Sequence, residues 1–187
     1  MSATEESREM RAAKETRRLL HEQTLSGTVQ QHIYEVIHVA AKTVQRLKPG
    51  ATISGMRESQ LRNVVNAALE ASSIEEVAAF IMFQLGRSTN RGPWSYNGFG
   101  EAVIADLTGP VRTIAEHARD RALEALAQAT PNDLPSDPDS QQLLATASIA
   151  LARQYLGYLN RLFYYADRAN GWDRLPKLVA QQEAQNA

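Results

Sequence analysis

The chain has 187 residues, 43% of them hydrophobic, and a formal net charge of −1 at neutral pH, which gives no support to a strongly basic nucleic-acid-binding protein. It contains no cysteine, so disulfides, thiolate metal sites and cysteine nucleophiles are excluded. The first 20 residues are polar and charged, unlike a signal peptide, and no apolar run approaches the roughly 18 residues of a membrane span, so we expect a cytoplasmic protein.

Apolar residues recur at helical spacing through the first quarter of the chain. Residues Thr4 to His21 predict a polar helix with a thin apolar stripe. A stronger pattern opens at Gly27 and ends at Pro49, and it predicts a second helix. The apolar residues of this second pattern are three, four or seven positions apart: Val29, Ile33, Val36, Ile37, Ala40, Val44 and Leu47.

The next two helices are expected over residues 58–71 and from Ser73 to about Leu85. Ser72 and Ser73 each precede a glutamate by three residues, which is the pattern of a capping box at the start of a helix. Gly86 follows the last apolar residue of the second helix, so we expect it to end that helix in the left-handed conformation.

Glycine and proline interrupt the second half of the chain. Residues 88–100 predict a loop with ordered aromatic side chains, and Gly109 followed by Pro110 predicts a kink or a new helix. The segment 129–139 is rich in proline and aspartate and predicts a linker, after which residues 140–170 predict a long helix. Four aromatic residues of this helix are expected in the core or at a helix–helix interface: Tyr155, Tyr158, Phe163 and Tyr165.

The fold class follows from these patterns. No segment of five or more residues alternates cleanly between apolar and polar residues, so we predict an all-α fold without a sheet. Short connections favour an antiparallel helical bundle of about five to seven helices. The expected organisation is a bundle over residues 1–128, a linker over 129–139, and a C-terminal region, 140–187, whose long helix packs on the bundle or on a partner.

Charge is distributed unevenly along the chain. Residues 1–48 hold eight Lys and Arg against six Asp and Glu, whereas residues 101–187 hold eight against eleven. We therefore expect any basic surface to come from the first half of the chain. Sixteen of the twenty basic residues are arginine, whose planar fork matches phosphate oxygens better than the point charge of lysine.

Two short polar phrases interrupt the apolar helical pattern between residues 50 and 107. The first is Thr52-Ile53-Ser54 followed by Ser59-Gln60-Leu61-Arg62-Asn63, and the second, about twenty residues later, is Phe83-Gln84-Leu85-Gly86-Arg87. In this order the pair resembles the small helical subunit of type III CRISPR–Cas interference complexes, the Csm-complex small subunit family. The resemblance implies a non-catalytic subunit without metal or cofactor. It also implies several copies within a ribonucleoprotein, beside other CRISPR–Cas subunits, guide RNA and target RNA.

The same resemblance implies sequence-independent contact with the backbone of the RNA duplex. Its positions in this chain are Gln60, Arg62, Gln84 and Arg87, to which we add Arg57 and Arg91 on grounds of charge. Further candidate contacts are the basic residues at positions i, i+3 and i+7 of the first helix and a tryptophan in the predicted loop: Arg11, Lys14, Arg18 and Trp94.

Structural explanations stand beside these functional ones. Glu58 precedes Arg62 by four residues, in the favourable orientation for an ion pair within one helix. Arg87 would complement the dipole at the end of a helix, and a tryptophan such as Trp94 commonly covers a hydrophobic core.

Catalytic patterns find little support in the sequence. The four histidines, His21, His32, His38 and His117, include no pair at the i, i+4 spacing of a helical zinc site. There is no phosphate-binding glycine loop and no nucleophile elbow, so we expect no enzyme and no cofactor. The alternative function is a helical protein–protein adaptor or structural subunit that does not contact nucleic acid.

A helix-turn-helix regulator is a third interpretation, with residues 58–71 and 73–85 as its two helices. The second of these helices carries Glu75, Glu76 and Phe80 where a reader of DNA bases would need Arg, Asn or Gln. We therefore do not expect this chain to read DNA.

Overall fold

The computed structural model describes residues 3–87, 92–130, 136–175 and 177. Within these residues the chain forms seven α-helices longer than one turn, the four-residue helix α3 (Ala51–Ser54) and three short 3-10 segments, without a strand. The predicted all-α bundle is confirmed. In the same described part of the chain, no helix has both the length and the apolar content needed to cross a membrane.

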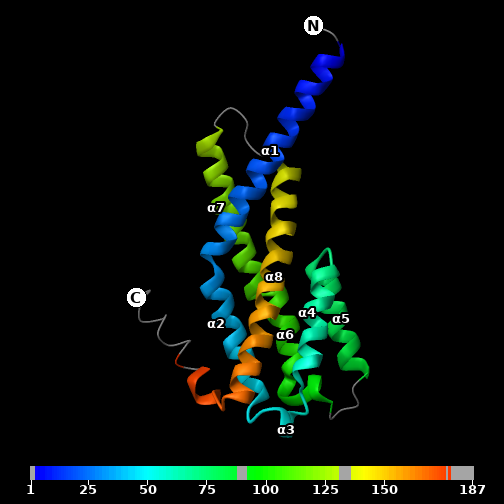
Figure 1. The fold of residues 1–187 in the computed structure, drawn as a ribbon, viewed down its shortest axis with the longest axis vertical. Helices are drawn as coiled ribbons and strands as arrows, with labels where there is room; N and C mark the ends of the chain where they lie inside the picture. The colour runs from blue at the N-terminus through cyan, green and yellow to red at the C-terminus, as the bar shows by residue number, and fades with distance from the viewer. Residues whose placement is uncertain (1–2, 88–91, 131–135, 176, 178–187) are drawn as a thin grey trace.

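Four helices run along the long axis of the molecule: α1 (Ala3–Gln31), α2 (Ile33–Val44), α7 (Pro110–Ala129) and α8 (Asp137–Arg168). Figure 1 shows α1 beside α7 and α8 in the upper half of the molecule and α2 beside α8 in the lower half. The first turns of α1 extend beyond the ends of both α7 and α8. The helix α7 begins at Pro110. Of the kink and the new helix that the sequence allowed here, the structure has the new helix.

The boundary between the first two helices differs from the sequence prediction. Gly27 and Thr28 lie inside α1, where Thr28 Oγ1 donates to the carbonyl oxygen of Leu25 and does not cap a new helix. Leu25 and Val29 are both buried, so the apolar stripe continues across the predicted start. The break falls instead at His32, a single turn residue with φ −96° and ψ 6°. Helical periodicity alone did not locate this break, because buried residues continue at helical spacing on both sides of it: Leu25, Val29, Val36 and Ala40.

The central element is α8, which packs against α2, α4 (Glu58–Glu70) and α7. The side chains of Tyr155 and Phe163 are buried, which confirms their predicted place in the core. Tyr155 OH donates to Asp106 Oδ2 at 2.7 Å, and Thr43 Oγ1 donates to the same oxygen. Since Asp106 lies on α6 (Phe99–Thr108) and Thr43 on α2, this carboxylate joins three helices inside the bundle.

The helices α4 and α5 (Ile74–Arg87) form a hairpin on one side of the lower half (Figure 1). The backbone N–H of Ser72 donates to Glu76 Oε2, and the N–H of Glu76 donates to Ser73 Oγ. The predicted serine–glutamate cap is therefore present at the start of α5. The hairpin buries one side of each helix against α6 and α8 through Leu61, Val64, Ala68, Ile74, Val77 and Ile81.

Candidate nucleic-acid interface

The hairpin brings the two polar phrases to one end of the molecule. The helix α4 has 13 residues and α5 has 14, and a turn of only three residues, 71–73, connects them. Because each residue advances a helix by about 1.5 Å, the start of α4 lies beside the end of α5. Figure 1 shows this end of the hairpin at the bottom of the molecule, next to α3. Arg57, Arg62 and Arg87 therefore belong to one end of the bundle.

At the start of α4, Arg57 has an extended backbone, with φ −119° and ψ 150°, and its N–H donates to Gln60 Oε1 at 2.8 Å. This bond orients the Gln60 amide and leaves its nitrogen as a donor. The Arg57 side chain is exposed and has no ion pair within the described residues. Arg57 and Gln60 thus place two donors beside the unsatisfied N–H groups of a helix start, where anions bind favourably.

Arg62 forms the predicted intrahelical ion pair. Its Nη2 lies 2.5 Å from Glu58 Oε1, and the two side chains remain 57% and 34% exposed, respectively. A solvent-exposed pair of this kind contributes only a few tenths of a kcal/mol to stability. The guanidinium has five N–H donors, so Glu58 holds it in position while other donors stay available to a ligand.

At the end of α5, the guanidinium carbon of Arg87 lies 5.4 Å from the ring centroid of Phe83. Phe83 is 57% exposed, so the stacked pair forms part of the surface. Gln84, on the same turn, is half-buried.

The predicted left-handed stop at Gly86 is wrong, because α5 continues through Gly86 to Arg87. Leu85 packs against the core, and its side chain lies close to Gly100 at the start of α6.

The predicted loop contributes less to the interface than its sequence indicated. Arg91 lies outside the described residues. Trp94 is only 2% exposed and packs against Phe99, with ring centroids 5.6 Å apart. Its assignment as an RNA contact is therefore wrong, because the short 3-10 segment Pro93–Gly98 turns the indole into the core. The alternative of a core-covering tryptophan is the correct one.

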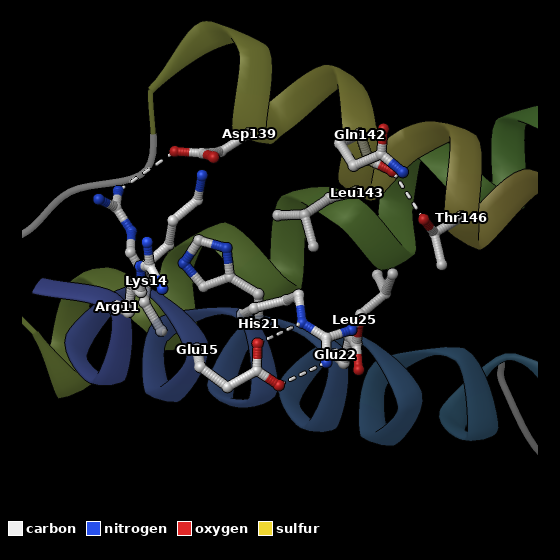
Figure 2. A pocket seen from close by; sticks show the side chains of 12 residues that line it. Arg11, Lys14, Glu15, His21, Glu22, Leu25, Asp139, Gln142, Leu143 and Thr146 are labelled. Carbon is white, nitrogen blue, oxygen red and sulfur yellow. Dashed lines mark hydrogen bonds and ion pairs between the residues drawn. The ribbon is translucent and has the colours of Figure 1, made fainter. Parts of the chain in front are cut away.

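The three basic residues of the first helix lie elsewhere. Arg11, Lys14 and Arg18 line a groove of about 970 Å³ between α1 and α8, shown in Figure 2. Arg18 is held by Glu15 at 2.6 Å and Glu22 at 2.7 Å, and the hydrogen bond from Arg18 lowers the pKa of the Glu15 carboxyl. This groove is at the opposite end of the long axis from α3 (Figure 1), so the structure does not bring it together with Arg62 and Arg87.

An exposed basic face on α8 was missed by the sequence analysis, which expected basic surface only from the first half of the chain. Arg161, Tyr164 and Arg168 are spaced three and four residues apart and so share one helix face. Tyr164 is 49% exposed, and the guanidinium carbon of Arg168 lies 5.9 Å from its ring centroid. Neither arginine has an acidic partner within the described residues. The i, i+3, i+7 spacing of Arg161, Tyr164 and Arg168 could have indicated this face from the sequence. The tyrosines of an otherwise apolar helix favoured a place in the core instead.

This face lies level with the start of α4. Arg153 on α8 donates from Nε to the carbonyl oxygen of Ala68 at 2.9 Å, which fixes the register of the two helices. Further along α8, Asp167 Oδ1 accepts the N–H of Ala51 in α3 at 2.9 Å. Later residues of α8 therefore meet earlier residues of the 51–68 segment, so α8 runs antiparallel to it. Tyr164 follows Arg153 by about three turns and points to the same side. The same number of residues back along α4 from Ala68 reaches Arg57.

We call this region the cationic end. It consists of five exposed arginines and two exposed aromatic residues from α4, α5 and α8: Arg57, Arg62, Phe83, Arg87, Arg161, Tyr164 and Arg168. Glu58 is the carboxylate paired with one of these arginines. Of these five arginines, only Arg62 has an acidic partner among the described residues, in a chain whose net charge is −1.

Within the described part of the chain, the cationic end offers guanidinium groups and no grouped metal ligands. Among the described residues, no three His, Cys, Asp or Glu side chains are grouped so that they could hold a metal ion. Comparison of the chain with protein-family models, curated proteins and solved structures finds no match. What the described residues define is an all-α bundle with exposed arginines and aromatic residues on the helices at one end.

Proposed function

We propose that this chain is a non-catalytic small subunit of a CRISPR ribonucleoprotein, and that its cationic end binds the backbone of guide RNA paired to target RNA without reading sequence. The observation that carries the proposal is the meeting of the two polar phrases. Residues Arg62 and Arg87 lie on consecutive helices, and the α4–α5 hairpin brings the start of α4 and the end of α5 to the same end of the bundle.

The chemistry of the cationic end fits an A-form duplex. Such a duplex presents phosphates and 2′-hydroxyls in its wide minor groove, and arginine forks match phosphate oxygens. Phe83 lies under Arg87 and Tyr164 under Arg168, which restricts both guanidinium groups before a ligand arrives. Restricting the side chains in advance lowers the entropy lost on binding.

One observation favours the alternative of a protein–protein adaptor. Met82 and Phe83 on α5 and Leu69 on α4 are each more than half exposed. Exposed apolar side chains that lie together mark protein contacts, and Met82 and Phe83 are consecutive residues of α5. In a ribonucleoprotein both functions are compatible, because neighbouring subunits would cover the apolar residues while RNA meets the arginines.

The test is RNA binding by the full chain carrying Arg62→Ala together with Arg87→Ala. Fluorescence anisotropy with an RNA duplex across a range of salt concentrations should show weaker binding. The dependence of log K on log salt should flatten by about one unit per lost phosphate contact. Circular dichroism should show unchanged helix content, because both side chains are exposed.

The matched control removes the same charge from α7 through Arg112→Ala with Arg121→Ala, both exposed arginines. This control should retain most of the affinity. Equal affinity and equal salt dependence for wild type, test and control variants would contradict the proposal and favour the adaptor. Recovery of small RNAs with the assembly purified from its source would support it independently.

A further inference from the structure

A buried histidine occupies the joint between α1 and α2. The His32 side chain is 4% exposed, and its Nδ1 lies 2.6 Å from Glu35 Oε1 one turn further along α2. Its other ring nitrogen, Nε2, is buried and has no hydrogen-bond partner among the described residues. Buried polar atoms without a partner are uncommon in folded proteins, so this nitrogen is a candidate ligand-binding atom.

A second histidine lies beside it. His117, on α7, has its ring centroid 6.4 Å from that of His32, with the ring planes inclined by 42°. His117 is exposed, and α7 packs along both α1 and α2. Arg121, one turn beyond His117, donates to Gln31 Oε1 at 3.3 Å and is therefore held on the last residue of α1.

The Glu35 contact determines which nitrogen of His32 is available. When Nδ1 carries the proton and donates it to the carboxylate, Nε2 presents a lone pair. Histidines that bind metal ions characteristically donate their other ring N–H to a carboxylate or carbonyl, which fixes the ring and strengthens the ligand. The Glu35 carboxylate accepts this hydrogen bond from Nδ1 of His32 when that nitrogen carries the proton.

The ring separation fits a shared ion. A metal–nitrogen bond of about 2.0–2.1 Å, added to the roughly 1.1 Å from nitrogen to ring centre, places each centroid about 3.2 Å from the ion. Two such rings are about 5.2 Å apart at a tetrahedral angle and about 6.4 Å apart when opposed. The observed 6.4 Å matches the opposed arrangement, in which the two nitrogens lie on opposite sides of the ion, as trans ligands of a square-planar Cu²⁺ ion do.

We infer that His32 and His117 supply two nitrogen ligands to a divalent late transition-metal ion, with water at the remaining positions. Imidazole nitrogen is a preferred ligand for Cu²⁺, Ni²⁺ and Zn²⁺, and affinity for such a site is highest for Cu²⁺. An ion bound there joins the α1–α2 joint to α7. Neither the proposed function nor the cationic end depends on it.

The test uses the untagged full chain and Cu²⁺ as the probe. Titration followed by electron paramagnetic resonance should show one bound ion per chain, with hyperfine splitting from two nitrogen ligands. His117→Ala should weaken binding at least tenfold. Glu35→Gln should weaken it by about ten- to one hundredfold, the usual effect of removing a carboxylate that orients a ligating histidine.

The matched control is His38→Ala, which removes another histidine of α2 and should leave the affinity unchanged. Zn²⁺ should raise the melting temperature of wild type and of this control more than that of His117→Ala, because an ion bound to the native state stabilises it. Equal Cu²⁺ affinity for His117→Ala and His38→Ala, or a spectrum with a single nitrogen ligand, would overturn the inference. Substitution at His117 is expected to leave the fold intact, since its side chain is exposed.

Discussion

Arg153 Nη2 donates to the carbonyl oxygen of Ala71 at 3.0 Å and so ties the end of α4 to the middle of α8. The last carbonyl groups of a helix have no partner within that helix. Here the Arg153 guanidinium, which belongs to α8, supplies donors to these carbonyl groups of α4, because its Nε also donates to the carbonyl oxygen of Ala68. The hairpin that carries Arg62 and Arg87 is therefore anchored at its turn as well as through its apolar side.

Replacement of Arg153 by methionine should lower the free energy of unfolding by about 2 kcal/mol, because hydrogen bonds from charged groups contribute about 1.5–3 kcal/mol. Methionine keeps much of the apolar stem, so the loss reports the hydrogen bonds. Urea denaturation measures it, with Arg161→Met on the exposed face of α8 as the control. A loss no larger than that of the control would show that α4 does not need this cap.

Asp106 predicts an unusual dependence of stability on pH. Burial raises the pKa of the Asp106 carboxyl, while hydrogen bonds from Thr43 and Tyr155 and the charge of Arg46 partly oppose the rise. The folded-state pKa therefore exceeds the unfolded value of about 3.9. The contribution of this group is fully present below about pH 3.9 and is lost as the pH rises through the folded pKa.

Asp106→Asn removes this titration while its side-chain oxygen still accepts hydrogen bonds from Thr43 and Tyr155. Relative to wild type, the variant should become progressively more stable as the pH rises from 4 to 7. Urea midpoints of both proteins across this range measure the difference. Other carboxyls with lowered pKa values, such as Asp139 and Asp173, act equally in both proteins and cancel. Parallel curves for the two proteins would refute the prediction.

Substitution of Glu58 is expected to strengthen the binding of duplex RNA. Its carboxylate lies 2.5 Å from Arg62 and neutralises part of the charge that RNA would meet. Glu58→Gln should therefore raise the affinity for duplex RNA several-fold and steepen its salt dependence slightly. The control, Glu70→Gln, removes a carboxylate from the other end of α4 and should have a smaller effect. If Glu58→Gln weakens binding, the ion pair is needed to orient Arg62.

The sequence predicted the elements but not the contacts between them. Apolar spacing located α4 and α8 within a few residues, because each buries one continuous side. The Ser73 cap was predicted because its partners are local. The bond between Arg153 and Ala71 joins residues 82 positions apart, and no local pattern indicates it. For the same reason Trp94 was misassigned: a loop sequence does not show which side faces the core.

The basic face of α8 supplies the most specific prediction about the interface. Arg161→Ala with Arg168→Ala should lower RNA affinity and flatten the salt dependence, as expected for lost phosphate contacts. The conservative variants Arg161→Lys and Arg168→Lys keep the charge but lose the fork and the stacking on Tyr158 and Tyr164, so they should recover only part of the affinity. Combination with Arg62→Ala should lower affinity further, because in the proposed function all three arginines contact the same RNA. If the α8 variants bind RNA as wild type does while Arg62→Ala does not, RNA contacts the hairpin alone and α8 faces a neighbouring subunit.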